Sequence, residues 1–169
     1  MLKRFLPDYR FKKVTEISRD VFIGADLLIF DLDNTLVFSG TSQTSREILD
    51  WFLTVKNRYR CILVSNNKNI FKRHKEISSL LGCRVFLSRH KKPFKKLFEE
   101  IKEEYRLKDG NKAVIVGDRV LTDVLFGNLH GFITILVQPI NNKEHILVKI
   151  MRRAENIMLL LIHKFGYTK

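Results

Sequence analysis

The chain has few of the features that mark secreted, fibrous, disordered or membrane-spanning proteins. Its 169 residues include only 2 cysteines and 3 prolines. Cys61 and Cys83 lack metal-type spacing and each lies beside an apolar run, which predicts buried, reduced thiols in an intracellular compartment. No apolar run approaches the roughly 20 residues that a membrane-spanning helix needs. The N-terminus has no apolar core of signal-peptide length, so we expect a cytoplasmic protein that is not secreted.

Acidic residues are also scarce, with 18 Asp and Glu against 31 Lys and Arg, for a formal charge of +13. Such a surface attracts nucleic acid, anionic lipid or polyphosphate. Basic residues cluster near the N-terminus and from Arg84 to Lys96, and the N-terminal cluster is interleaved with apolar and aromatic residues. Two interpretations stay open for this arm. Either it lies at the interface on the inner face of a membrane, or it packs its aromatic side chains on the domain.

Composition favours one compact domain. Hydrophobic residues make up 45% of the chain and charged residues 29%, there is no low-complexity linker, and the length suits a single core. We expect a basic arm at 1–24 packed on the core, a core at 25–140, and a C-terminal helical segment at 141–169.

Apolar runs alternate with amphipathic stretches, which predicts an α/β fold. Strands are expected at 27–31, 60–65, 84–87, 113–117 and 132–137. Helices are expected at 45–57, 68–81, 94–106 and 119–129, with a last helix at 143–166. This order predicts a five-stranded parallel sheet flanked by helices through right-handed crossovers.

Two carboxylates, Asp31 and Asp33, follow the apolar run 27–30 at the expected carboxyl end of a strand, where parallel sheets place their chemistry. If the extended backbone continues, both side chains share one orientation and Leu32 points into the fold. Closely held like charges favour a bound cation or a raised pKa on one of them. One carboxylate can attack while the other shuttles a proton.

Two further motifs supply groups that can bind a phosphoryl oxygen. Ser65 follows the run 61–64 and either donates to such an oxygen or caps the next helix. Lys92 precedes Pro93, which biases it toward an extended backbone at the mouth of the site. There it either neutralises a phosphoryl group or belongs to a solvated basic loop.

The run 113–116 ends in Gly117-Asp118, and Asp123 follows five residues later. Gly117 allows close approach of the backbone to a ligand. Asp118 can complete a magnesium site with Asp31 and Asp33, because Mg²⁺ prefers oxygen ligands. Asp123 either orients Lys92 or a metal-bound water, or caps a helix near Thr122.

In this order, the four motifs resemble those of the haloacid-dehalogenase-like (HAD) phosphatases. The sequence is similar, up to about Arg153, to the YqeG-type subfamily, which is itself similar to mitochondrial phosphatidylglycerophosphatases. The run Val64–Asn67 and the segment Gly117–Asp123 are typical of that subfamily. The resemblance implies a Rossmann-like HAD core in which the first strand is central and the strands carrying Asp31 and Asp118 are adjacent. Neither position where HAD enzymes insert a cap domain leaves room for one, so we expect no cap and an open site.

The resemblance implies that Asp31 attacks phosphorus and that Asp33 acts as acid and then base. It also implies Mg²⁺ held by Asp31, the Asp33 backbone carbonyl and Asp118. Ser65 and Lys92 would bind the transferring phosphoryl group, and Asn34 and Asn66 would complete its cradle.

The expected enzyme is a magnesium-dependent phosphatase that converts phosphatidylglycerophosphate to phosphatidylglycerol in phospholipid biosynthesis. Two alternatives are a phosphatase for soluble sugar or nucleotide phosphates and, from another class, an RNA- or ribosome-associated binding protein.

The last helix has a clear apolar period. Ile150, Ala154, Ile157 and Leu161 step at helical spacing, and Ile146 and Phe165 extend the stripe at its ends. The stripe is widened by Leu147, Met151, Met158 and Ile162. This basic amphipathic helix either docks the stripe on the domain or lays it in a membrane surface.

Overall fold

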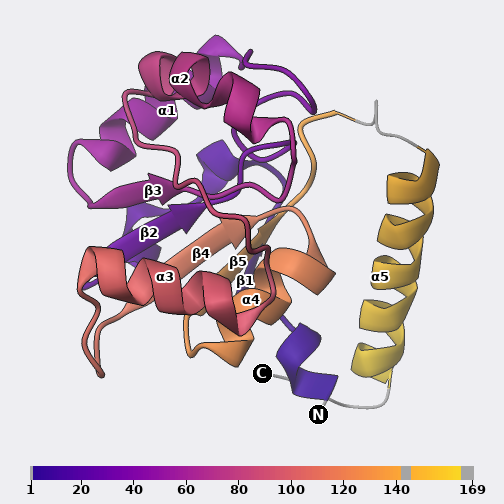
Figure 1. Cartoon of the computed structure of the whole chain (residues 1–169). Helices are drawn as coiled ribbons and strands as arrows, with labels where there is room; N and C mark the ends of the chain where they lie inside the picture. Colours follow the sequence, from indigo (N-terminus) through magenta and orange to yellow (C-terminus); the bar gives the residue numbers. More distant parts are fainter. Residues whose placement is uncertain (1, 142–145, 165–169) are drawn as a thin grey trace.

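The computed structural model describes residues 2–141 and 146–164, and side chains within these ranges except those of 146–149 and 163. Five parallel strands form one sheet in the order β1-β5-β4-β2-β3 (Figure 1). The strands are β1 (Tyr9–Phe11), β2 (Leu27–Phe30), β3 (Cys61–Leu63), β4 (Ala113–Gly117) and β5 (Ile133–Val137). The predicted five-stranded parallel α/β fold is therefore confirmed.

The helices follow the strands in chain order. They are α1 (Arg46–Lys56), α2 (Ile70–Leu81), α3 (Lys95–Tyr105), α4 (Leu125–Leu129) and α5 (Ile146–Lys164). Short helical turns lie at η1 (Leu2–Phe5), η2 (Val14–Glu16) and η3 (Arg19–Phe22), and a π-helical turn, η4 (Val120–Val124), precedes α4. The ends expected for the last helix, 143–145 and 165–166, lie outside the described residues.

Strand β2 organises two cores because its side chains alternate between the faces of the sheet. Leu28 and Phe30 enter the core that contains Phe52 of α1 and Ile77 of α2. On the other face, Leu27 and Ile29 enter the core that includes side chains of α3 and α4, Leu97, Ile101 and Phe126. Helices α1 and α2 cover one face and α3 and α4 the other (Figure 1). All four β2 residues are buried, which fixes the backbone that carries the following carboxylates.

The membership of the sheet differs from the prediction at both edges. The run 84–87 makes only a single bridge, between Leu63 and Val85, so a full strand there was wrong. The fifth strand is β1, which comes from the basic arm and pairs with β5. Asp8 directs this pairing, since its carboxylate accepts from the Thr134 amide at 2.8 Å and its own amide donates to the Thr134 carbonyl at 3.0 Å.

Strands β2 and β4 are neighbours, as expected, with Phe30 in register with Val116. Asp31 and Asp118 therefore follow adjacent strands at one edge of the sheet. Strand β2 lies inside the sheet, but β4 rather than β2 holds the middle position.

Helix α5 turns a different face to the core from the one its apolar period marks. Leu159 and Ile162 are buried in a third cluster with Leu6, Val120 and Val124. The centre of the predicted stripe points outward, and its members Ile150, Ile157 and Leu161 are 56%, 58% and 49% exposed. The stripe residues Ile146, Leu147 and Phe165 lie outside the described side chains. Among the described residues, docking of the stripe on the domain is confined to its margin, where Met158 and Ile162 pack in the third cluster. Within those residues, none of the helices has the length and apolar character to cross a bilayer.

Candidate active site

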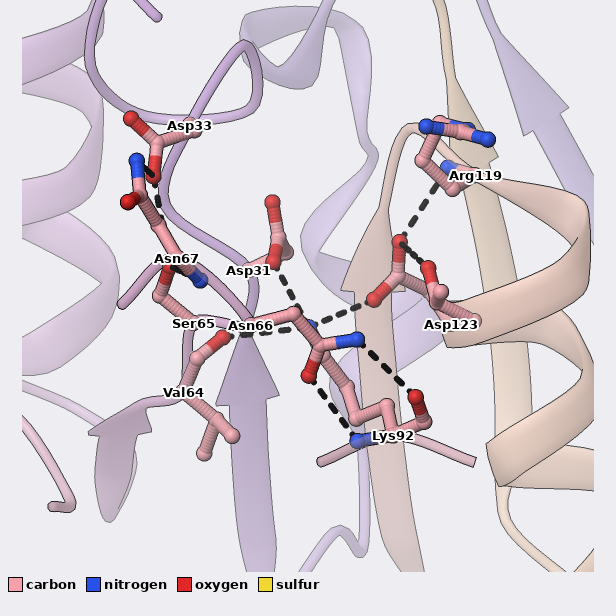
Figure 2. Close-up of polar contacts among 10 residues, drawn as sticks. Asp31, Asp33, Val64, Ser65, Asn66, Asn67, Lys92, Arg119 and Asp123 are labelled. Atoms are coloured by element: carbon pink, nitrogen blue, oxygen red, sulfur yellow. Dashed lines mark hydrogen bonds and ion pairs between the residues drawn. The ribbon is translucent and has the colours of Figure 1, made fainter. Parts of the chain in front are cut away.

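Lys92 is the most buried charge at the carboxyl edge of the sheet, with a side chain 0% exposed. Its ammonium lies 2.6 Å from the Asp31 carboxylate, 2.6 Å from the Asp123 carboxylate and 3.0 Å from the Val64 carbonyl (Figure 2). These acceptors match the three protons of an ammonium. Burial alone would lower the pKa of Lys92, but the two carboxylates outweigh burial and raise it, so the residue is a fixed cation.

Asn66 holds the backbone of Lys92. The Asn66 side-chain oxygen accepts from the Lys92 amide at 2.9 Å, and its nitrogen donates to the Lys92 carbonyl at 2.9 Å (Figure 2). Each polar atom of the Asn66 side chain makes one bond to Lys92 and has capacity for another, so its predicted contact with phosphate stays a prediction. Asn66 also fixes the position from which the lysine side chain enters the site.

Asp33 does not share the orientation of Asp31, because the extended backbone ends at Phe30. Leu32 is fully buried, as expected, but the Asp33 carboxylate turns toward a separate set of donors. It accepts from the Gly40 amide at 2.7 Å, Arg73 at 3.1 Å, Ser65 at 3.2 Å and Asn67 at 3.3 Å. The Asp33 side chain therefore does not join the carboxylate cluster of Asp31, Asp118 and Asp123, and its backbone carbonyl stays the predicted ligand atom.

Asp118 and Asp123 occupy the loop and π-helical turn that follow β4. The Asp118 carboxylate accepts from Arg152 of α5 at 2.6 Å, and its carbonyl accepts from the same guanidinium at 2.7 Å. Asp123 contacts Lys92, as expected, and also accepts from the Arg119 amide at 3.1 Å at the start of the turn. It therefore combines the two roles that the sequence left open.

Gly117 is required by Asp123 rather than by a ligand. A Cβ at this position would lie 2.3 Å from the Asp123 Cγ atom, far inside a normal contact. Only glycine lets the Asp123 carboxylate pass beside β4 and reach Lys92.

Helix α5 also holds the backbone of the turn η4. Glu155 is 2% exposed; its carboxylate pairs with the Arg119 guanidinium at 3.0 Å and accepts from the Leu121 amide at 3.3 Å. Together with the Arg152–Asp118 pair, this contact joins the last helix directly to the residues after β4. Arg73, Arg119, Arg152 and Glu155 were all missed by the sequence analysis. The ion-pair partners of Arg73, Arg119 and Arg152 lie 34 to 40 residues away in the chain, so no local pattern marks these residues.

A cavity of about 240 Å³ opens where these groups meet. Its walls include six predicted site residues, Asp31, Asp33, Asn34, Ser65, Asn66 and Asp118, together with Asn67, Arg119 and Arg152. Lys92 and Asp123 do not line it. Asn34 has a positive φ of 67° and its amide donates to the Val37 carbonyl, so it shapes the turn after Asp33. Three of the four sequence motifs thus line one cavity, and the fourth reaches it through the contact of Lys92 with Asp31.

Three buried carboxylates in this cluster exceed the two cations that contact them. Burial raises the pKa of Asp31 well above its ordinary value, against the opposing effect of Lys92 and with Asp123 and Asp118 adding to the rise. Burial likewise raises the pKa of Asp118 to about 7, although Arg152 acts in the opposite direction. A further cation would offset this excess of negative charge.

The donor set suits a hard divalent cation. Oxygen atoms of Asp31, Asp118 and Asp123 lie within 4.8 Å of one another, and all three residues are buried. Carboxylates are ligands that Mg²⁺ accepts alongside water and a substrate phosphate. Of the described residues, Asp31 and Asp118 fit the predicted metal-binding role, and Asp123 adds a third carboxylate beside them.

The raised pKa of Asp118 predicts how a cation changes stability with pH. A carboxyl whose pKa is higher in the folded state stabilises the fold below its unfolded pKa, and this contribution is lost as pH rises through about 7. Bound Mg²⁺ needs the ionised carboxylate and should restore stability at high pH. We expect Mg²⁺ to raise the melting temperature by about 5 °C at about pH 8 and far less at about pH 5.5.

Thermal unfolding with and without Mg²⁺ at the two pH values measures this difference. Asp118→Asn should lose the response, whereas Asp109→Asn, at a side chain 97% exposed, should keep it. An equal shift at both pH values, or a full shift in Asp118→Asn, would contradict the assignment.

Comparison with known proteins identifies the family. The family described as "Mitochondrial PGP phosphatase" matches residues 2–141, which include every predicted site residue but not α5. No solved structure matches the chain at a significant level.

Three curated proteins are similar in sequence. "Probable phosphatase YqeG" of Bacillus subtilis is 33% identical over 171 residues, covering 99% of this chain and 97% of that protein. "Phosphatidylglycerophosphate phosphatase 1, chloroplastic" of Chlamydomonas reinhardtii is 29% identical over 95% of this chain and 61% of that protein. The Arabidopsis thaliana "Phosphatidylglycerophosphate phosphatase 1, chloroplastic/mitochondrial" is 34% identical over 50% of this chain and 24% of its own length. The chain is a phosphatase that belongs to the mitochondrial PGP phosphatase family.

Proposed function

We propose that this phosphatase hydrolyses the terminal phosphomonoester of phosphatidylglycerophosphate and releases phosphatidylglycerol, with Mg²⁺ as cofactor. The family match over residues 2–141 carries the proposal, together with the cavity that its motifs line. Asp31 and Asp118 would hold Mg²⁺, with Asp123 beside them and the Asp33 carbonyl as a further oxygen. When bound, the ion would offset negative charge on the phosphoryl oxygens.

Asp31 would act as the nucleophile. Lys92 holds one of its carboxylate oxygens at 2.6 Å, and Figure 2 shows the other directed away from Lys92. That second oxygen would form a bond to phosphorus while the bond from phosphorus to the glycerol oxygen breaks. Lys92 stays protonated throughout, so it orients the carboxylate and balances its charge without exchanging a proton.

Asp33 lines the same cavity and would manage the protons. It would give a proton to the departing glycerol oxygen and then take one from the water that attacks the Asp31 acyl phosphate. Arg73, Ser65 and Asn67 hold its carboxylate in this position. Hydrolysis of the acyl phosphate frees inorganic phosphate and regenerates Asp31, so the cycle consumes one water.

Phosphate release from phosphatidylglycerophosphate in mixed micelles, with Mg²⁺ present, tests this proposal. Asp31→Asn should reduce turnover by about 10³-fold or more, because Asn can still accept from Lys92 but cannot attack phosphorus. Asp109→Asn removes an equal charge at an exposed position and should leave turnover unchanged.

A panel of soluble phosphomonoesters, measured alongside, separates the lipid proposal from its alternative. Release from sugar or nucleotide phosphates with none from the lipid would confirm a phosphatase and reject the lipid substrate. Full lipid turnover by Asp31→Asn would reject the nucleophile. Salt-sensitive RNA binding without hydrolysis that depends on Asp31 would instead support the nucleic-acid alternative.

We further propose that the outer face of α5 rests on an anionic bilayer. Its exposed apolar residues are Ile150, Met151, Ile157, Leu160 and Leu161, at 47% to 69% exposure. Exposed Arg153 and Lys164 lie on the same helix, and η1, which contacts α5, adds exposed Leu2, Lys3 and Arg4. Apolar and basic residues on one amphipathic surface favour an interface with anionic lipid. The inner face of α5 meanwhile holds Asp118, so the docked helix would bring the site to its substrate.

Sedimentation with vesicles tests the surface directly. Ile157→Glu combined with Leu161→Glu should reduce binding to phosphatidylglycerol vesicles by about tenfold or more. The double variant removes two exposed apolar side chains that would enter the bilayer and adds two negative charges. Ile23→Glu with Phe71→Glu makes the same exchange at exposed positions outside α5 and should bind normally. Unchanged binding by the α5 variant, or a dimer in solution that this variant dissolves, would reject the bilayer as the occupant.

A further inference from the structure

A second cavity, of about 530 Å³, lies between the β1–β5 edge of the sheet and α5. It shares Asp118 and Arg152 as walls with the cavity that contains Asp31 and Asp33. Arg152 therefore stands between the two spaces. The proposed phosphoryl transfer uses only the cavity at Asp31 and Asp33. The larger cavity is therefore available to the part of the substrate that does not react.

The register of the sheet links this cavity to the site. Arg10 of β1 is opposite Leu136 of β5, and Leu136 is opposite Gly117 of β4, the residue before Asp118. Adjacent strands are separated by about 4.8 Å, so the Arg10 backbone lies about 10 Å from the backbone that carries Asp118. A long arginine side chain can bridge much of this distance along the cavity.

The cavity contains unneutralised positive charge. Among the described residues, the Arg10 guanidinium and the Lys12 ammonium have no hydrogen-bond or ion-pair partner, although both line the space. The other charged walls are already matched, Arg152 with Asp118 and Glu155 with Arg119. Partial burial lowers the pKa of Arg10, and an anion bound beside the guanidinium would oppose this effect.

The remaining walls are mixed in a way that suits an amphiphile. The apolar residues Val120, Leu136 and Leu159 line the space, and Gln138 and Asn156 add neutral polar groups. A purely inorganic anion would not use the apolar walls, and a neutral lipid would not use the two cations. A phosphodiester joined to glycerol carbons uses both.

We propose that this cavity is a second substrate subsite, in which Arg10 and Lys12 bind the phosphodiester of the lipid while its phosphomonoester occupies the cavity at Asp31. The proposal rests on the proposed function, because phosphatidylglycerophosphate carries both groups on one three-carbon bridge. The subsite would let β1 and the rest of the basic arm distinguish the lipid from other phosphomonoesters. Soluble phosphomonoesters that lack a second phosphate forgo this contact.

Calorimetric binding of dihexanoyl phosphatidylglycerol tests the subsite without any turnover. This probe carries the phosphodiester but no phosphomonoester. Arg10→Gln combined with Lys12→Gln should weaken its binding by about tenfold or more, because charge-assisted hydrogen bonds to phosphate are lost. Lys108→Gln with Lys112→Gln removes the same charge at exposed positions near the other end of β4 and should bind as the natural chain does. Arg10→Lys should keep most of the affinity.

Kinetics then separates this proposal from the proposed function. With dihexanoyl phosphatidylglycerophosphate, Arg10→Gln/Lys12→Gln should raise KM by about tenfold with little change in kcat, and it should leave glycerol 3-phosphate hydrolysis unaltered. The subsite is overturned if the natural chain does not bind the phosphatidylglycerol probe, or if the double variant binds it equally well. Probe binding that depends on Arg10 and Lys12, without hydrolysis of the lipid phosphomonoester, would keep the subsite and reject the proposed substrate.

Discussion

The buried ammonium of Lys92 is the interaction on which the rest of the site depends. It contacts Asp31 after β2, the Val64 carbonyl after β3 and Asp123 after β4, so one cation ties together the ends of three strands. Each carboxylate would be costly to bury alone, and the lysine would be equally costly without them. Gly117 leaves the space through which Asp123 approaches, and Asn66 fixes the backbone of the lysine. The sheet edge thus becomes a rigid platform for Asp31.

Helix α5 is part of this site although the family match ends at residue 141. Arg152 holds Asp118, and Glu155 holds both the Arg119 side chain and the Leu121 amide. These polar contacts select the face of the helix that turns inward, and they explain why the strongest apolar stripe is exposed. An amphipathic helix docks the face whose apolar and polar contacts together stabilise it most. In α5 this face combines the apolar contacts of Leu159 and Ile162 with the ion pairs of Arg152 and Glu155.

The positions of the site residues were more predictable from the sequence than the edge strands of the sheet. Asp31, Lys92 and Asp118 each follow an apolar run or precede a proline, and such local signals place them at one sheet edge. Strand β1 was missed because three residues carry no usable period, and its pairing depends on Asp8 and Thr134, 126 residues apart. The run 84–87 has strand-like composition but forms one bridge only. The shared orientation of Asp31 and Asp33 failed because the backbone turns after Phe30, where Arg73 and Ser65 capture the second carboxylate.

The central claim is that Asp31 carries the phosphoryl group during turnover. Quenching the enzyme while it hydrolyses phosphatidylglycerophosphate, followed by borohydride reduction and peptide mass spectrometry, reads this directly, because reduction converts an aspartyl phosphate to homoserine. The account predicts homoserine at position 31 and at no other aspartate, and only when Mg²⁺ and substrate are both present. An active enzyme that yields unmodified Asp31, or homoserine at Asp33 or Asp118, would contradict it.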